Sequence, residues 1–251
     1  PKWDGFRCLL QRRGGAVSLT SKSGQDLARY FPEVADAAME LPERTFLLDG
    51  ELVIPQGKHL SFDSLLQRIH PARSRVAKLS VETPARYLAF DLLQRGRKDL
   101  ARQDLSFRRP ALVAFAERCF ANTLFALSPA SLNIADAKRW LKAAGGGSDG
   151  VVAKRLDLPY QSGNREGMQK VKLIRSADCV IGGFRYAETM IGKRKVVGSL
   201  LLGLYDGSEL HHVGFTSGLK ASEKPELTDR LETMVAEASF TGKIPGGRSR
   251  W

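Results

Sequence analysis

The sequence predicts an α+β fold divided between two domains. Strand-like runs alternate with amphipathic helical segments up to about residue 176, and strand-like runs then follow one another closely. The length of 251 residues suits one large domain or two of ordinary size. We therefore expect a first domain over residues 1–176 and a second over residues 177–251.

Apolar spacing predicts the first elements of the first domain. Residues 17–20 alternate with period two and predict a strand, as does the Leu- and Val-rich run 46–54. Residues 31–41 predict a helix, because a proline occupies the first turn and apolar side chains fall on one face. Ser61 is expected to cap a further helix whose apolar positions are Phe62, Leu65, Leu66 and Ile69.

The rest of this domain follows the same alternation. Residues 87–93 predict a strand, and residues 107–119 and 134–144 predict helices. Three consecutive glycines end the second of these helices. Two further strands are expected around residues 151–153 and at Val171.

The second domain is predicted as three strands followed by a helix. The strands are residues 179–184, 196–205 and 209–215, with Asp206-Gly207 as a tight turn between the last two. The helix is marked by Leu227, Leu231, Met234, Val235 and Ala238. This order is that of an OB-fold barrel. Because the chain begins at Pro1 and ends without a closing strand, we expect the first domain to be truncated at its N-terminus and the second at its C-terminus.

Composition favours a nucleic-acid partner. Lys and Arg number 39 against 27 Asp and Glu, which gives a formal net charge of +12 and predicts a polyanionic partner. No run of about 18 apolar residues or secretory signal is present, so we expect no membrane partner. Three scattered cysteines exclude a disulfide scaffold and a zinc module. A cytoplasmic monomer is expected.

Five short motifs occur in a fixed order and carry the chemistry. They are Lys2-Trp3-Asp4-Gly5-Phe6-Arg7, Asp49-Gly50-Glu51, Phe90-Asp91, Asp149-Gly150-Val151-Val152-Ala153-Lys154 and Lys170-Val171-Lys172. The first matches K-x-D-G-x-R, and a single match of this kind needs the context of the others. The chain resembles the ATP-dependent DNA ligases, a family of covalent nucleotidyltransferases. The segments 199–203 and 245–247 resemble most the short bacterial ligase C type.

The residues alone explain why such a set could transfer a phosphoryl group. A lysine attacks phosphorus only when its amine is neutral, which desolvation or neighbouring cations promote. Lys170 and Lys172 lie two residues apart on a strand and therefore point to one face. Two ammonium groups there could hold a phosphate and favour the neutral amine of Lys2.

The resemblance implies the fold, activity and site. It implies a nucleotidyltransferase domain of ATP-grasp-like antiparallel sheets and helices, followed by an OB-fold. It implies that ATP is the cofactor, that AMP is carried covalently on Lys2 and passed to the 5′-phosphate of nicked duplex DNA, and that Mg²⁺ or Mn²⁺ assists. A DNA-repair role near the bacterial nucleoid follows. The expected catalytic residues are Lys2, Lys170 and Lys172; the expected nucleotide-binding residues are these three with Asp4, Gly5, Arg7, Glu51, Phe90 and Lys154.

Metal and DNA contacts complete the expected site. Glu51 is expected near the ribose and the metal, and Asp149 is a second metal candidate, because hard cations prefer carboxylate oxygens. The expected nucleic-acid contacts are Arg7, Lys22 and the basic cluster Lys193, Arg194 and Lys195, which suits sequence-independent phosphate contact.

Other interpretations stay open. Asp49 and Glu51 could lie on the solvated face of an edge strand, Phe90 could be a core residue, and Asp149 could be a turn residue. Asp149 replaces the usual Glu of its motif, and no R-x-D-K motif occurs in the 251 residues, so we expect weak self-adenylylation from a protein that ends at Trp251. An RNA ligase, an mRNA-capping guanylyltransferase and a non-catalytic nucleic-acid-binding relative are the alternative functions.

Overall fold

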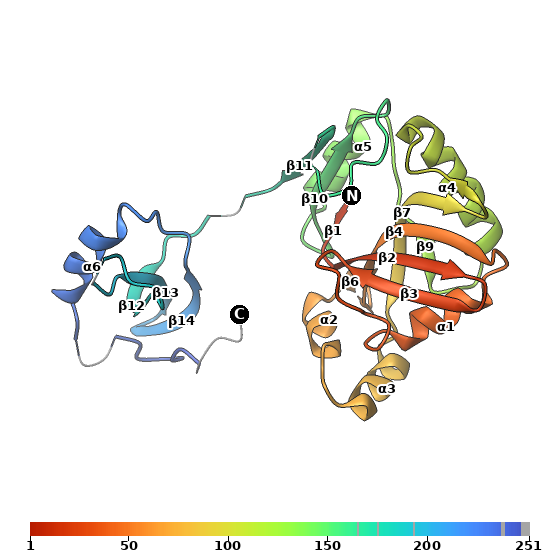
Figure 1. Cartoon of the computed structure of the whole chain (residues 1–251). Coiled ribbons are helices and arrows are strands. Elements are labelled where there is room, and N and C mark those ends of the chain that lie inside the picture. Colours follow the sequence, from red (N-terminus) through yellow and green to blue (C-terminus); the bar gives the residue numbers. More distant parts are fainter. Residues whose placement is uncertain (165, 175, 193, 237–238, 247–251) are drawn as a thin grey trace. The chain divides into compact units, whose positions relative to one another are not determined.

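The computed structural model describes residues 1–164, 166–174, 176–192, 194–236 and 239–246. It divides the chain into two compact units, residues 1–174 and 175–251 (Figure 1). Both units combine helices with sheets in which neighbouring strands are antiparallel, apart from one parallel pair. The predicted α+β class is therefore confirmed.

The larger sheet of the first unit carries three of the expected motifs. Its strands lie in the order β3-β2-β4-β7-β8, and β9 pairs with β7 in parallel. β4 lies between β2 and β7 and is hydrogen-bonded to both, so the interpretation of Asp49 and Glu51 as residues of an edge strand is wrong. The strand bounds are β2 (Phe6–Arg13), β3 (Ala16–Ser21), β4 (Thr45–Val53), β7 (Arg86–Arg95), β8 (Lys98–Asp99) and β9 (Phe125–Leu127).

A smaller sheet carries the other two motifs together with the first lysine. It consists of β1 (Lys2–Trp3), β10 (Ser148–Lys154) and β11 (Met168–Lys172), with β10 between the other two. Gly150 is required at the centre, because a Cβ there would lie 2.1 Å from the carbonyl oxygen of Val171. A separate hairpin joins β5 (Pro55–Gln56) and β6 (His59–Leu60).

Four of the five helices in this unit lie where the sequence predicts them. Ser61 caps α2 as expected, accepting a hydrogen bond from the backbone N–H of Ser64 at 3.2 Å. The fifth helix, α3, was not predicted; only Val76 is buried in it, so it has no apolar stripe to detect. The bounds are α1 (Pro32–Glu40), α2 (Phe62–Arg68), α3 (Arg73–Glu82), α4 (Leu105–Cys119) and α5 (Ile134–Lys142).

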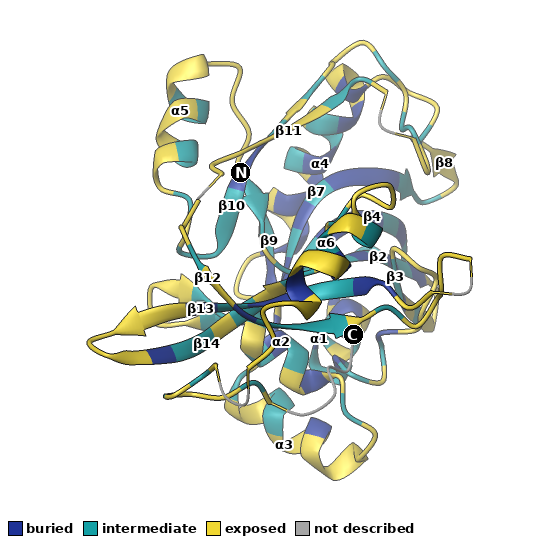
Figure 2. Ribbon diagram, turned by 90° about the vertical axis from the view of Figure 1, so that its left-hand side faces the viewer, coloured by how far each residue is buried: buried dark blue, intermediate teal, exposed yellow. Residues whose placement is uncertain are grey.

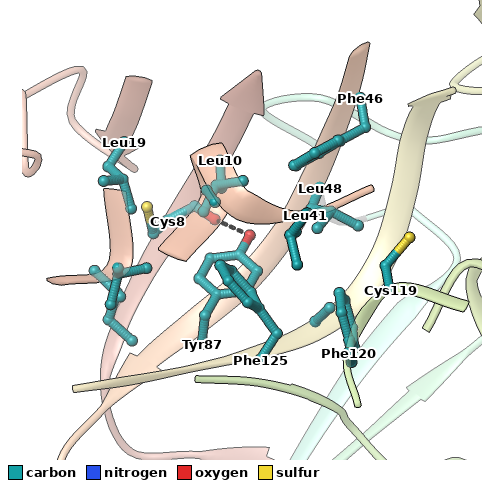
Figure 3. Packing of buried hydrophobic residues seen from close by; sticks show 14 of the residues in the cluster. Cys8, Leu10, Leu19, Leu41, Phe46, Leu48, Tyr87, Cys119, Phe120 and Phe125 are labelled. Atoms are coloured by element: carbon teal, nitrogen blue, oxygen red, sulfur yellow. Dashed lines mark hydrogen bonds between the residues drawn. The ribbon is translucent and has the colours of Figure 1, made fainter. Parts of the chain in front are cut away.

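The hydrophobic core of the first unit is packed between the larger sheet and its helices. Figure 3 shows Tyr87 inside this core, where its hydroxyl donates to the carbonyl oxygen of Cys8 at 2.8 Å. Phe46 and Phe115 meet edge to face, with ring centroids 5.2 Å apart. In Figure 2 the central strands are dark, whereas α5 has no buried residue. The core thus fixes the strands that present the motif residues.

The second unit is a three-stranded antiparallel sheet with one helix. Its strands β12 (Val180–Tyr186), β13 (Val197–Asp206) and β14 (Glu209–Thr216) occur where expected. The helix α6 (Lys224–Glu232) is shorter than predicted. Met234 and Val235 lie beyond its end and are 64% and 69% exposed; Ala238 lies outside the described residues. In the described ranges, no helix of either unit is long and apolar enough to cross a membrane.

Candidate active site

The smaller sheet brings the first lysine to Asp149 and Lys172, which are 147 and 170 positions away in the sequence. Lys2 on β1 is paired in register with Gly150 on β10, and Gly150 is paired in turn with Lys172 on β11. Asp149 then lies between the two amines. Its carboxylate oxygens are 2.7 Å from Lys2 Nζ and 2.5 Å from Lys172 Nζ.

The charge balance of this trio favours an ionised Asp149. Partial burial alone would raise the pKa of Asp149, but hydrogen bonds from Lys172 and Lys2 outweigh it and lower the pKa. The same bond raises the pKa of Lys172, which is exposed. Asp149 is therefore a bridge between two ammonium groups, which differs from the turn residue of the alternative interpretation.

Backbone and side-chain contacts fix Lys2 at the edge of this sheet. The indole Nε1 of Trp3 donates to Ser128 Oγ at 2.9 Å, and the backbone N–H of Asp4 donates to the carbonyl oxygen of Gly147 at 3.0 Å. Gly5 crosses β4 so closely that a Cβ would lie 2.3 Å from the carbonyl oxygen of Leu52. The K-x-D-G-x-R motif thus connects β1 of the smaller sheet to β2 of the larger one.

The carboxylate of Glu51 has a raised pKa. Burial is the largest influence and raises the pKa of Glu51 to about 7; Asp49 and Asp4 raise it further, while Lys2 and Arg7 oppose them. Lys2 is thus close enough to influence the titration of Glu51. A divalent cation beside this carboxylate would favour its ionised form.

The donor set fits a cation that shares its ligands with a substrate. Among the described residues, no cluster of three or more His, Cys, Asp or Glu side chains could hold a metal ion by itself. Mg²⁺ commonly takes one or two carboxylates and completes its shell with water and substrate phosphates. Glu51 suits such a site, whereas Asp149 is already engaged by Lys2 and Lys172.

Arg7 is held by a buried carboxylate and a tyrosine. Arg7 Nε and Nη2 donate to Asp49 Oδ1 and Oδ2 at 3.1 and 2.7 Å. Arg7 Nη2 also donates to the hydroxyl of Tyr160 at 3.0 Å, and that hydroxyl donates to Asp49 Oδ2 at 2.8 Å. Asp49 is fully buried, so this arrangement satisfies a carboxylate that would otherwise be costly.

Phe90 lies between two cations rather than in the core. Lys154 Nζ is 4.8 Å from the centroid of its ring, and Arg7 Cζ is 6.0 Å from it. Burial lowers the pKa of Lys154, against the attraction of Asp91 and Asp49. The ring, the two cations and the half-buried position together form a face suited to a planar, electron-rich base.

The remaining predicted residues lie on β11, in the turn after β3 and in the second unit. Lys170 shares β11 with Lys172, two residues earlier. Lys22 is exposed in the turn that follows β3. In the second unit Arg194 forms ion pairs with Asp229 and Glu232, Lys195 is exposed, and Lys193 lies outside the described residues.

Two residues of the site were missed in the sequence. Tyr160 is 153 positions from Arg7 and 111 from Asp49, so no local pattern joins them. Arg108 belongs to none of the five motifs, yet it is buried and donates two hydrogen bonds, of 2.8 and 3.0 Å, to Asp91, the residue after Phe90. An isolated aromatic in a Pro- and Gly-containing segment was the only local signal for Tyr160.

Comparisons with known proteins show which family this chain resembles. A model of the ATP dependent DNA ligase domain matches residues 1–172. DNA ligase C2 of Mycolicibacterium smegmatis is 45% identical over the whole chain and 74% of its own length. DNA ligase C of Mycobacterium tuberculosis is 41% identical over 94% of the chain and 66% of its own length. A solved mycobacterial DNA ligase D, complexed with ATP and MES, superposes with a TM-score of 0.55 at 27% identity, covering 97% of this chain and 74% of its own.

Proposed function

This chain belongs to the family of ATP-dependent DNA ligases, and we propose that it carries AMP covalently on Lys2. The observation that carries the proposal is the trio Lys2, Asp149 and Lys172, with bonds of 2.7 and 2.5 Å, beside Glu51. A lysine so placed has a neighbouring cation and a carboxylate that fixes its direction. Lys2 must still lose a proton before its amine can attack phosphorus.

The proposed first step joins Lys2 to the AMP part of ATP. Lys2 first loses one proton to water; its neutral amine attacks the α-phosphorus, a P–N bond forms, the bond to the bridging oxygen breaks, pyrophosphate leaves with the electron pair, and the attacking nitrogen gives a second proton to water. Lys170 and Lys172 on one face of β11 would neutralise charge on the phosphates. The ion pair between Asp149 and Lys2 would break as the phosphates replace Asp149 as the partner of Lys172.

The nucleotide would be oriented by residues of both sheets. Phe90 offers its ring to adenine, with Lys154 at its edge, and Arg7 and Glu51 would reach the ribose. Asp4 and Gly5 shape the turn that presents Lys2. Mg²⁺ or Mn²⁺, when bound at Glu51 with Asp149 as a second candidate ligand, supplies positive charge against the phosphates.

The proposed DNA substrate follows from charge and from the relatives. AMP would pass from Lys2 to the 5′-phosphate of nicked duplex DNA, and the 3′-hydroxyl would displace it. Arg7, Lys22 and the cluster Lys193, Arg194 and Lys195 would hold phosphates without reading sequence. We propose an OB-fold for residues 177–251 as the DNA clamp, and a monomeric DNA-repair enzyme at the nucleoid in the bacterial cytoplasm.

Intact mass of the protein tests the covalent step. We expect incubation with ATP and a divalent cation to add about 329 Da, one AMP, and pyrophosphate to remove it. Lys2→Ala should show no adduct. Lys58→Ala, an exposed lysine in the β5–β6 turn, should label normally.

The outcomes separate the alternative functions. Labelling by GTP instead of ATP would indicate a capping guanylyltransferase. Sealing of nicked RNA but not of nicked DNA by the labelled protein would indicate an RNA ligase. If neither nucleotide labels Lys2 in the full-length protein, the proposal fails and a purely binding role takes its place.

A further inference from the structure

We propose that Tyr160 is a positioning residue of this enzyme, which holds the guanidinium of Arg7 so that its free edge faces the nucleotide. The inference rests on the proposed function, in that Arg7 is taken to contact ATP. It assigns a role to a residue that lies outside all five motifs.

Arg7 is fixed on one side and open on the other. The guanidinium can donate five hydrogen bonds. Nε and Nη2 together make three, two to Asp49 and one to Tyr160. Within the described part of the chain, Nη1 makes no hydrogen bond, and the Arg7 side chain is 36% exposed. The open edge is therefore available to a ligand.

Tyr160 removes the remaining freedom of this guanidinium. Asp49 alone compensates the charge of Arg7, but the guanidinium can still tilt about its two hydrogen bonds to that carboxylate. The Tyr160 hydroxyl accepts from Nη2 and donates to the same carboxylate oxygen that Nη2 contacts, which closes a three-membered network. A network in which every member is satisfied rigidifies a site more than its separate pairs do.

The loop that carries Tyr160 is anchored to the rigid part of the unit. The backbone N–H of Tyr160 donates to the carbonyl oxygen of Ala101 at 2.8 Å. The first N–H groups of α4, at Leu105 and Ser106, donate to the carbonyls of Leu158 and Leu156 at 3.0 and 2.8 Å. Asp104, at the N-cap position, forms no side-chain cap, so these loop carbonyls replace it.

The second anchor of Tyr160 is an ion pair next to Phe90. Arg108 on α4 grips Asp91 with two bonds, donates to the carbonyl oxygen of Leu158 at 3.3 Å, and lies 5.9 Å from the centroid of the Tyr160 ring. Tyr160 therefore connects the pair Arg7–Asp49 to the strand that presents Phe90. The loop that carries Tyr160 thus positions both Arg7 and Phe90, the two residues that face the nucleotide.

Steady-state sealing of nicked duplex DNA at varied ATP, in which Lys2 is adenylylated once in each turnover, tests the role. Tyr160→Phe should raise the KM for ATP about tenfold, because a hydrogen bond to a charged group is lost, with kcat within about twofold. Tyr186→Phe is the matched control, since its hydroxyl donates to the Glu232 carboxylate at 2.7 Å in the second unit, and it should leave both constants unchanged.

A double-mutant cycle distinguishes positioning from a merely structural role. Arg7→Lys keeps a cation beside Asp49 but removes the open edge, so adding Tyr160→Phe to it should change the KM by less than about twofold. An unchanged KM in Tyr160→Phe, or a full tenfold rise on top of Arg7→Lys, would overturn the inference. Failure of the wild-type protein to label would instead refute the proposed function.

A second variant decides the question if Tyr160→Phe lacks a cooperative thermal transition. Gly167, at φ +68°, would place a Cβ 2.3 Å from Leu158 Cδ1, so Gly167→Ala moves the loop without touching the hydroxyl. We expect it to raise the KM for ATP in the wild-type background and not in Arg7→Lys. An equal rise in both backgrounds would contradict the role of Tyr160 through Arg7.

Discussion

At Glu51, the environment that suits a metal ligand works against the stability of the fold. Burial raises the pKa of Glu51 from an ordinary 4.5 to about 7. Below pH 4.5 the group is protonated in both states and costs nothing. Between pH 4.5 and 7, Glu51 ionises in the unfolded chain but stays largely protonated in the folded protein. The free energy of unfolding therefore falls as pH rises through this range, and it levels off above pH 7.

Replacing Glu51 by Gln should therefore stabilise the protein in a pH-dependent manner. We expect Glu51→Gln to raise the free energy of unfolding by about 1–3 kcal/mol at pH 8 and by little at pH 4.5, while slowing adenylylation of Lys2. Urea denaturation at the two pH values measures this. Glu40→Gln, at the exposed end of α1, is the control. An equal gain at both pH values would show that Glu51 does not titrate as described.

At the scale of elements, strands and helices with one apolar face could be predicted, and those without one could not. The strand β2 has buried positions at Cys8, Leu10 and Arg12. Its sequence shows no clear apolar–polar alternation, because the apolar Leu9 faces outward and the charged Arg12 faces inward. Arg12 is buried because it donates to backbone carbonyls, including that of Leu41 at 2.6 Å. The sequence identifies the five motifs, whereas their assembly depends on strand pairings between residues far apart.

The attachment of α4 to β7 gives the element-scale prediction. Arg108 and Asp91 are both buried and bonded twice, so Arg108→Met would leave an unpaired buried carboxylate. We expect a loss of about 3–5 kcal/mol in the free energy of unfolding, partly recovered in Arg108→Met/Asp91→Asn. Arg97→Met in the exposed β7–β8 turn should change stability by less than about 0.5 kcal/mol. Equal losses from the two arginines would show that the pair does not anchor the helix.

At the scale of the whole molecule, the excess of positive charge was the earliest correct indication of a polyanionic substrate class. The +12 charge says nothing about fold, and it does not tell which cations are available. Arg194 shows the difference. The sequence places it in a basic cluster, while the structure pairs it with Asp229 and Glu232 of α6. A phosphate would have to compete with these carboxylates for Arg194, whereas Lys195 is exposed.

Salt dependence of binding to nicked duplex DNA tests this distinction. Each phosphate contact contributes about −0.9 to the slope of log affinity against log salt, so Lys195→Ala should flatten the slope by about 1, equally for unrelated DNA sequences. Asp229→Asn should act in the opposite direction, tightening binding at low salt and steepening the slope, because Arg194 is released to the DNA. Arg194→Ala should abolish the effect of Asp229→Asn. If Asp229→Asn weakens binding, or acts equally without Arg194, the ion pair serves the packing of α6 and Arg194 is not a DNA contact.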